Sequence, residues 1–243
     1  MRAGRAVLAA VAFLTRVPVG RVELGRDDVA RGSVLFPLVG AGIGLVVGLV
    51  AVGLDSRLGP LLAAALAVAF EALLTGAIHL DGLADTADGL GAGTRERALA
   101  VMREGAIGAF GATALGLDLL VKTAALAAIL SGPAPVLALV AAFAVGRAAP
   151  LALAAAFPYA REEDGIGRAL AGRPWPAGGV ALGIVVAVGA LGMRGLWIAG
   201  AAAVAVVALA LVARRLGGVT GDVLGAAAEL GTTFALVGAA WTR

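Results

Sequence analysis

Long apolar segments dominate the pattern of this chain. They fall near residues 34–54, 60–80, 107–130, 135–157, 178–193 and 196–213, with a weaker one near 222–241. Most approach the roughly 20 apolar residues that a helix needs to cross a bilayer. Because backbone groups that face lipid must be paired within a helix, we interpret all of them as helices. The pattern predicts an all-α, polytopic integral membrane helix bundle of about six to eight membrane helices.

The first residues resemble a signal peptide only superficially. Arg2 and Arg5 precede a short apolar core, but Arg16 and Pro18 follow where a small-residue cleavage site would be needed. We therefore expect a retained short helix near 3–17 that lies on the membrane or partly in it.

Composition supports a membrane protein and excludes several kinds of chemistry. Hydrophobic residues make up 61% of the 243 residues and charged residues 14%, against about 45–50% and 25% in soluble domains. With no linker, residues 1–243 form one integral membrane domain. The absence of cysteine excludes disulfides and Cys-ligated metals, and a single histidine excludes a multi-histidine site within one chain. Without a basic, aromatic-interleaved surface, we expect no nucleic-acid partner.

The arginines fall mainly on one side when the connections are numbered alternately. Twelve lie on that side, against two, Arg57 and Arg194, on the other. Positive residues favour the cytoplasmic side of a membrane. The two acidic segments described next lie on the same side, so we expect an active site that faces the cytoplasm, in the cell (inner) membrane.

The segment HLDGLADTADGL, residues 79–90, contains three aspartates on one helical face. In a helix Asp85 lies roughly 40° from Asp81, and Asp88 lies about 20° to the other side. Like charges this close repel unless a cation lies among them, and carboxylates suit Mg²⁺. A solvated helix face is the alternative. We predict a metal site at Asp81, Asp85 and Asp88, and assign all three to catalysis as well.

A second acidic segment is GGVTGDVLGAAAEL, residues 217–230. Asp222 and Glu229 share a helical face. Gly217, Gly218 and Gly221 would let backbone N–H groups approach a phosphate at a helix N-terminus, so Gly218 and Gly221 are candidate substrate-binding residues. Asp222 is a further predicted metal ligand, although it could simply cap the helix. A carboxylate within an apolar helix is costly, so Glu229 is a candidate catalytic residue. Because both segments lie on one membrane side, we expect them to pack side by side around one site.

Two basic residues lie inside apolar segments. Lys122 is four residues from Asp118, which suits an intrahelical ion pair. Arg147 has no local partner, so it pairs with an acid on another helix or holds a substrate phosphate. We include both as candidate substrate-binding residues. Burying Glu71 within an apolar segment is also costly, and this residue could pair with another buried polar group. For His79 we favour a structural role over catalysis.

Six motifs together resemble one enzyme family. They are FLTRVPV at 13–19, RGSVLFPLVGAGIG at 31–44, HLDGLADTADGL at 79–90, RERALAVMREGAIGAFG at 95–111, PYAREEDGIG at 158–167 and GGVTGDVLGAAAELG at 217–231. In this order they are similar to the cobalamin synthase family, adenosylcobinamide-GDP ribazoletransferase. The aspartate spacing differs from the motifs of membrane prenyltransferases and of CDP-alcohol phosphotransferases.

The resemblance implies an Mg²⁺-dependent transferase of vitamin B12 biosynthesis. Its reaction would join adenosylcobinamide-GDP to α-ribazole or α-ribazole 5′-phosphate and release GMP. The chain departs from the family where M-[KR]-D-S-[RK]-[ILV]-G is usual, because here residues 102–108 read MREGAIG. Glu104 retains a carboxylate, and Arg103 remains a candidate substrate-binding residue.

Two alternatives remain open at this point. A transporter would also place acids in a membrane, but near the midplane and with inverted repeats; here the acids cluster at the cytoplasmic ends, and we find no repeat. A second alternative is another Mg²⁺-dependent membrane transferase that acts on a diphosphate-linked substrate, since no residue pattern here explains recognition of a corrin ring.

Overall fold

The structure, a computed structural model, describes residues 2–20, 23–161 and 166–242. Arg21 and residues 162–165 of the 158–167 motif therefore lie outside the described residues. Within them the helices are α1 (Arg2–Leu14), α2 (Arg26–Gly32), η1 (Ser33–Leu35), α3 (Phe36–Leu58), α4 (Pro60–Thr75), α5 (Ile78–Gly91), α6 (Arg95–Val101), α7 (Ala109–Leu130), α8 (Pro135–Ala156), η2 (Ile166–Ala169), α9 (Trp175–Leu191), α10 (Met193–Leu216) and α11 (Gly221–Trp241).

The all-α membrane bundle is confirmed. Five helical segments of the described chain are long and apolar enough to cross a membrane, and α4 with α5 makes a sixth if this bent pair counts as one span. The predicted number of about six to eight membrane helices therefore agrees with the structure only at its lower limit. The apolar helix α9 has 17 residues and falls short of the span length.

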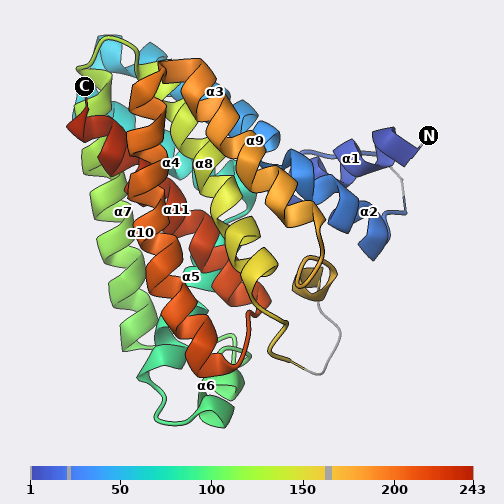
Figure 1. Ribbon diagram of the computed structural model, residues 1–243. Helices are drawn as coiled ribbons and strands as arrows, with labels where there is room; N and C mark the ends of the chain where they lie inside the picture. The colour runs from blue at the N-terminus through green and yellow to red at the C-terminus, as the bar shows by residue number, and fades with distance from the viewer. Residues whose placement is uncertain (1, 21–22, 162–165, 243) are drawn as a thin grey trace.

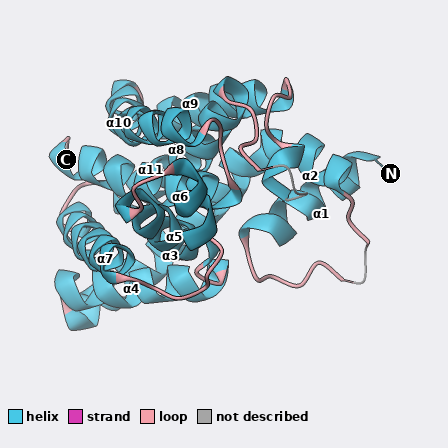
Figure 2. Ribbon diagram, turned by 90° about the horizontal axis from the view of Figure 1, so that it is seen from below, coloured by secondary structure: helices cyan, strands magenta, loops and turns pink. Residues whose placement is uncertain are grey.

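Helices α8 and α11 form the centre of the bundle (Figure 1). Helix α8 contacts α3, α9 and α11, while α11 also contacts α5, α7 and α10. Small residues such as Ala141, Ala144 and Ala227 are fully buried there, which lets the helices approach closely. Helices α1 and α2 lie beside the bundle, away from α7 and α10 (Figure 2). Helix α1 ends at Leu14, earlier than the predicted residue 17.

The apolar segment predicted at 60–80 is not one helix. Gly76 and Ala77 both adopt left-handed backbone conformations, with φ of 68° and 56°, and α4 and α5 meet at 92°. A left-handed residue ends an α-helix, and alanine adopts this conformation only at a cost. The three aspartates therefore do not extend α4 but lie on a separate helix, α5.

Helices α5 and α11 cross in direct backbone contact. A Cβ atom added to Gly82 would lie 2.8 Å from the backbone oxygen of Asp222 and 3.1 Å from Cα of Gly225. This confirms that the two acidic segments pack side by side. Gly82 and Gly225 are the opposing residues at this crossing.

Replacing Gly82 with alanine is expected to destabilise the protein by about 1–3 kcal/mol, because the methyl group would force α5 and α11 apart. Gly116→Ala in α7 is the control, since a Cβ there meets no atom within 4 Å; it should be neutral or stabilising by up to about 1 kcal/mol. Thermal unfolding in detergent measures both. Equal stability of Gly82→Ala and the wild type would contradict the contact.

Candidate active site

A cavity of about 290 Å³ lies where α5 and α11 cross. Its polar lining comes from His79 and Asp81 on α5, Asp222 on α11, and Tyr159 in the segment after α8. The rest of the wall is mainly apolar and includes Phe13, Leu14, Phe36, Ile78, Pro150, Leu170 and Leu224. A concave, mostly apolar site with a few converging polar groups is typical of substrate binding.

Three carboxylates gather at this cavity. Asp81 and Asp222 line it from opposite helices, and Asp85, half-buried one turn further along α5, lies within electrostatic range of both. Within the described residues, no group of three or more acidic or histidine side chains is arranged to enclose a metal ion. Mg²⁺ is usually bound by one or two carboxylates together with substrate phosphates. The donor set therefore fits Mg²⁺ held jointly with a phosphorylated substrate.

Asp88 has a different environment from the other two aspartates. Its carboxylate accepts hydrogen bonds from the backbone N–H groups of Gly108, at 2.7 Å, and Gly111, at 2.8 Å. These groups open α7, where an acid satisfies unpaired N–H groups and interacts favourably with the helix dipole. Side chains at Gly108 and Gly111 would collide with this carboxylate. Asp88 thus caps α7 in the structure, although it lies on the predicted face of α5.

Asp222 is paired with Arg161. Nη2 of Arg161 lies 2.7 Å from Oδ2 of Asp222, and the hydroxyl of Thr220 donates to the same oxygen at 3.2 Å. Thr220 also accepts the N–H of Val223, so Thr220 rather than Asp222 caps α11. Sequence reasoning missed Arg161, which we had counted only among the basic residues of one membrane side. Its place in the motif 158–167 was the available signal.

The two predicted phosphate-binding glycines differ in the structure. Gly218 uses its N–H to bond the backbone oxygen of Ala213 at 2.8 Å, and a Cβ there would lie 2.9 Å from the nitrogen of Ala160. Gly218 therefore permits close backbone packing, and its own N–H is used within the fold. Gly221 lines the cavity, and a Cβ atom added there would meet no atom within 4 Å.

Behind the cavity lies a buried ion cluster formed by Glu71, Asp118, Lys122, Arg147 and Glu229. Nζ of Lys122 pairs with Glu229 and, at 3.1 Å, with Glu71. Arg147 pairs with Glu71 at 3.2 Å, and Asp118 lies 4.0 Å from Lys122. The cluster joins α4, α7, α8 and α11.

The ion cluster provides partners for the charges predicted within apolar segments. Of the two alternatives for Arg147, the structure shows the ion pair with an acid on another helix, and Glu71 is that acid. Lys122, Arg147 and Glu229 are at most 1% exposed and do not line the cavity. Arg147 also contacts the backbone oxygen of Ala228, a lining residue, at 3.4 Å. The cluster therefore supports the cavity wall and does not reach into the cavity.

Residues 102–108, where the sequence departs from the family pattern, lie apart from the cavity. Arg103 is exposed, and Glu104 pairs with Arg97 at 3.9 Å. Glu104 and Gly108 line a separate, open hollow together with Asp88. Glu104 thus lies near Asp88, which caps α7, and not at the cavity lined by Asp81 and Asp222.

Comparisons with known proteins agree on one family. Residues 6–240 match the family model described as cobalamin-5-phosphate synthase. Proteins named adenosylcobinamide-GDP ribazoletransferase are similar over nearly the whole chain: 42% identical in Bradyrhizobium diazoefficiens, covering 95% of this chain and 91% of the relative, 41% in Citrobacter koseri, covering 94% and 96%, and 40% in Klebsiella pneumoniae, covering 96% and 98%. No solved structure matches the chain.

Replacing Asp88 with asparagine is expected to cost about 0.5–2 kcal/mol of stability, because an amide has one acceptor oxygen where the cap uses two. Stability can be measured by denaturation in detergent and Mg²⁺ affinity by calorimetry. Asp88→Asn should weaken Mg²⁺ binding less than Asp85→Asn does. A larger loss of metal affinity in Asp88→Asn, with unchanged stability, would return Asp88 to the metal site.

Glu71→Gln is expected to destabilise the protein by about 3–5 kcal/mol, because Lys122 and Arg147 would both lose a buried counter-charge. Glu96→Gln serves as the control, since the Glu96 side chain is 77% exposed, and should change stability by less than about 0.5 kcal/mol. The two variants are compared by thermal unfolding. A stability loss for Glu71→Gln no larger than for the control would show that the cluster does not hold the helices together.

Proposed function

Because this chain belongs to the cobalamin-5-phosphate synthase family, and is by that membership an adenosylcobinamide-GDP ribazoletransferase, we propose that the cavity between α5 and α11 is its active site. The observation that carries this assignment is the meeting of carboxylates from two helices, Asp81 and Asp222, in one mostly apolar cavity. Transporter function, the alternative from another class, receives no support from the relatives.

The transfer replaces one phosphate ester bond with another. A ribose hydroxyl of α-ribazole, or of its 5′-phosphate, attacks the phosphorus attached to the corrinoid side of adenosylcobinamide-GDP. A new P–O bond forms, the diphosphate P–O bond breaks, and GMP leaves with the electron pair while the hydroxyl loses its proton. Such a reaction depends mainly on positioning and on neutralising charge. Residues around the diphosphate would therefore matter more than a covalent nucleophile.

Asp81, Asp85 and Asp222 are the residues that would hold Mg²⁺ together with the diphosphate oxygens. When bound, Mg²⁺ supplies positive charge that stabilises the oxygens of the transferred phosphoryl group. With a metal ion between them, the three carboxylates would hold the diphosphate at a defined position relative to the apolar wall. Gly221, whose Cα faces open space at the start of α11, leaves room for substrate beside Asp222.

The apolar wall is expected to exclude water from the reaction. Phe13 and Phe36 stack with ring centroids 5.3 Å apart, and both line the cavity with Leu170. Water that reached the diphosphate would hydrolyse it and release GMP without making cobalamin. A dry cavity also strengthens electrostatic interactions between the carboxylates and their ligands.

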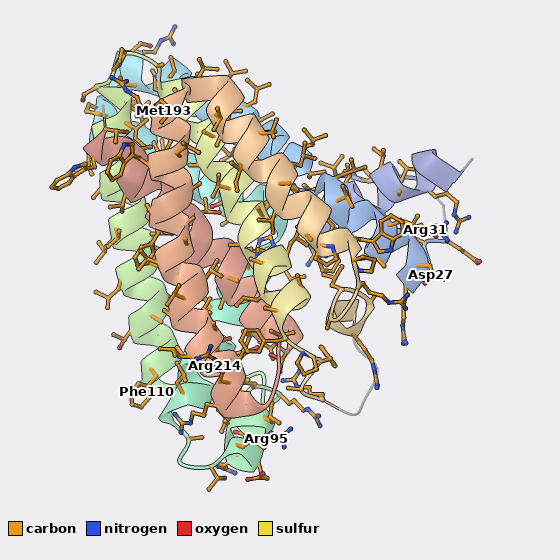
Figure 3. The ribbon with its side chains drawn as sticks, viewed as in Figure 1. Asp27, Arg31, Arg95, Phe110, Met193 and Arg214 are labelled. Carbon is orange, nitrogen blue, oxygen red and sulfur yellow. The ribbon has the colours of Figure 1, made fainter. Side chains whose placement is uncertain are left out.

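The active site would face the cytoplasm. Arg95 and Arg214 lie at the end of the bundle opposite Met193 (Figure 3), and the cavity is formed by the first residues of α11, which follow Arg214 and Arg215 closely in the chain. Clustered arginines favour the cytoplasmic side of the cell membrane. Exposed apolar residues such as Leu120 on α7 and Val207 on α10 would contact membrane lipid.

The purified protein, reconstituted in lipid, should convert adenosylcobinamide-GDP and α-ribazole to a cobalamin and GMP in equal amounts, and only with Mg²⁺ present. Asp85→Asn and Asp222→Asn should lower kcat/KM by about 10²-fold or more, because each removes charge that stabilises the transferring group. Glu96→Gln is the matched control. Full activity in excess EDTA would refute the metal proposal, and GMP release without cobalamin would refute transfer.

A further inference from the structure

We propose that Arg161 occupies the place of the metal ion beside Asp222 in the free enzyme and moves to the substrate diphosphate when the metal binds. The guanidinium would pair with Asp222 in the free enzyme, which we call its placeholder role, and would bind the diphosphate in the substrate complex. This inference rests on the proposed Mg²⁺ site. It adds a residue that the acidic motifs themselves do not contain.

The backbone that precedes Arg161 is firmly held. Val219 donates to the oxygen of Pro158 at 2.8 Å, and Ala160 donates to the oxygen of Val219 at 2.9 Å. Nη2 of Arg95 adds a hydrogen bond to the oxygen of Ala160 at 3.1 Å. These bonds attach the segment to the start of α11. Arg161 can therefore exchange partners by rotating its side chain, with no movement of the backbone before it.

Toward the described residues, the guanidinium of Arg161 uses little of its hydrogen-bonding capacity. A guanidinium has five N–H donors, and within the described residues one of them, on Nη2, bonds the Asp222 carboxylate. The Nε atom is buried and has no hydrogen-bond partner there. The side chain is 14% exposed, against 20% for Asp222, so the pair lies at the edge of the protein surface. A group with unused donors at the rim of the cavity is suited to accept a second ligand.

Electrostatics gives a reason for the exchange. Asp81, Asp85 and Asp222 repel one another, and the positive charge of Arg161 acts on Asp85 as well as on its partner Asp222. Arg161 already neutralises the Asp222 carboxylate through Oδ2, so a metal ion at Asp222 would lie beside a second positive charge, and the two cations compete for the carboxylate. Once released from Asp222, the guanidinium would bind the diphosphate, because two phosphate oxygens can accept hydrogen bonds from its planar pair of N–H groups.

Competition predicts effects of opposite sign on two ligands. Removing Arg161 should strengthen binding of the metal alone by about two- to fivefold, the range expected for a partly exposed ion pair. The same change should weaken binding of a diphosphate by about tenfold, because a charged, bidentate contact is lost. A residue that only supports the fold would weaken both.

The test uses the full-length protein in lipid nanodiscs. Mn²⁺ affinity is measured by electron paramagnetic resonance without substrate, and GDP affinity by equilibrium dialysis in saturating Mg²⁺. The variants are Arg161→Ala and Arg161→Lys, with Arg173→Ala as the control, since Arg173 lies outside this cavity. Arg161→Ala should bind Mn²⁺ more tightly and GDP more weakly. Arg161→Lys keeps the charge but not the fork, and should lose GDP affinity with Mn²⁺ affinity near that of the wild type.

The outcomes separate this inference from the proposed function. Unchanged or weaker Mn²⁺ binding by Arg161→Ala, while the wild type binds Mn²⁺ through Asp222, would overturn the placeholder role and leave the metal site standing. Failure of the wild type to bind Mn²⁺ both without substrate and with saturating GDP, or equal binding by Asp222→Asn, would overturn the metal site and the role of Arg161 with it.

Discussion

The backbone contact between Gly82 and Gly225 is the constraint on which the site depends. Because neither residue has a side chain, α5 and α11 approach closely enough to place Asp81 and Asp222 in the same cavity. The left-handed turn at Gly76 and Ala77 makes this crossing possible, since it directs α5 away from α4 by 92°. Two acidic segments more than a hundred residues apart thereby meet at one cavity.

The buried ion cluster explains how a small bundle keeps this crossing in place. Lys122 and Arg147 join acids on α4 and α11, and Arg147 also donates to Thr232 at 2.7 Å. Taking such charges out of water is costly, and a buried pair is better evidence of fixed geometry than of net stability. Arg147 of the cluster contacts Ala228, and so fixes the turn of α11 that contains Ala228 at the cavity wall. Asp222, at the start of α11, lines the same cavity.

Sequence patterns predicted the spans and both acidic segments because apolar length and carboxylate spacing are local properties. They could not predict the break at Gly76–Ala77, since the surrounding residues remain apolar. They could not show that the N–H of Gly218 bonds the backbone oxygen of Ala213. They also could not show that Asp88 caps α7, because its partners lie about twenty residues away. The partner of Arg147 and the role of Arg161 required contacts between distant segments.

The central claim is that α5 and α11 bind one metal–diphosphate complex between them. An electron cryo-microscopy structure with adenosylcobinamide-GDP and Mg²⁺ tests it most directly. We expect the diphosphate in the cavity at Gly82 and Gly225, with carboxylate oxygens from both Asp222 and an α5 aspartate about 2.1 Å from Mg²⁺. A diphosphate bound elsewhere, or a metal ion held by α5 alone, would contradict it.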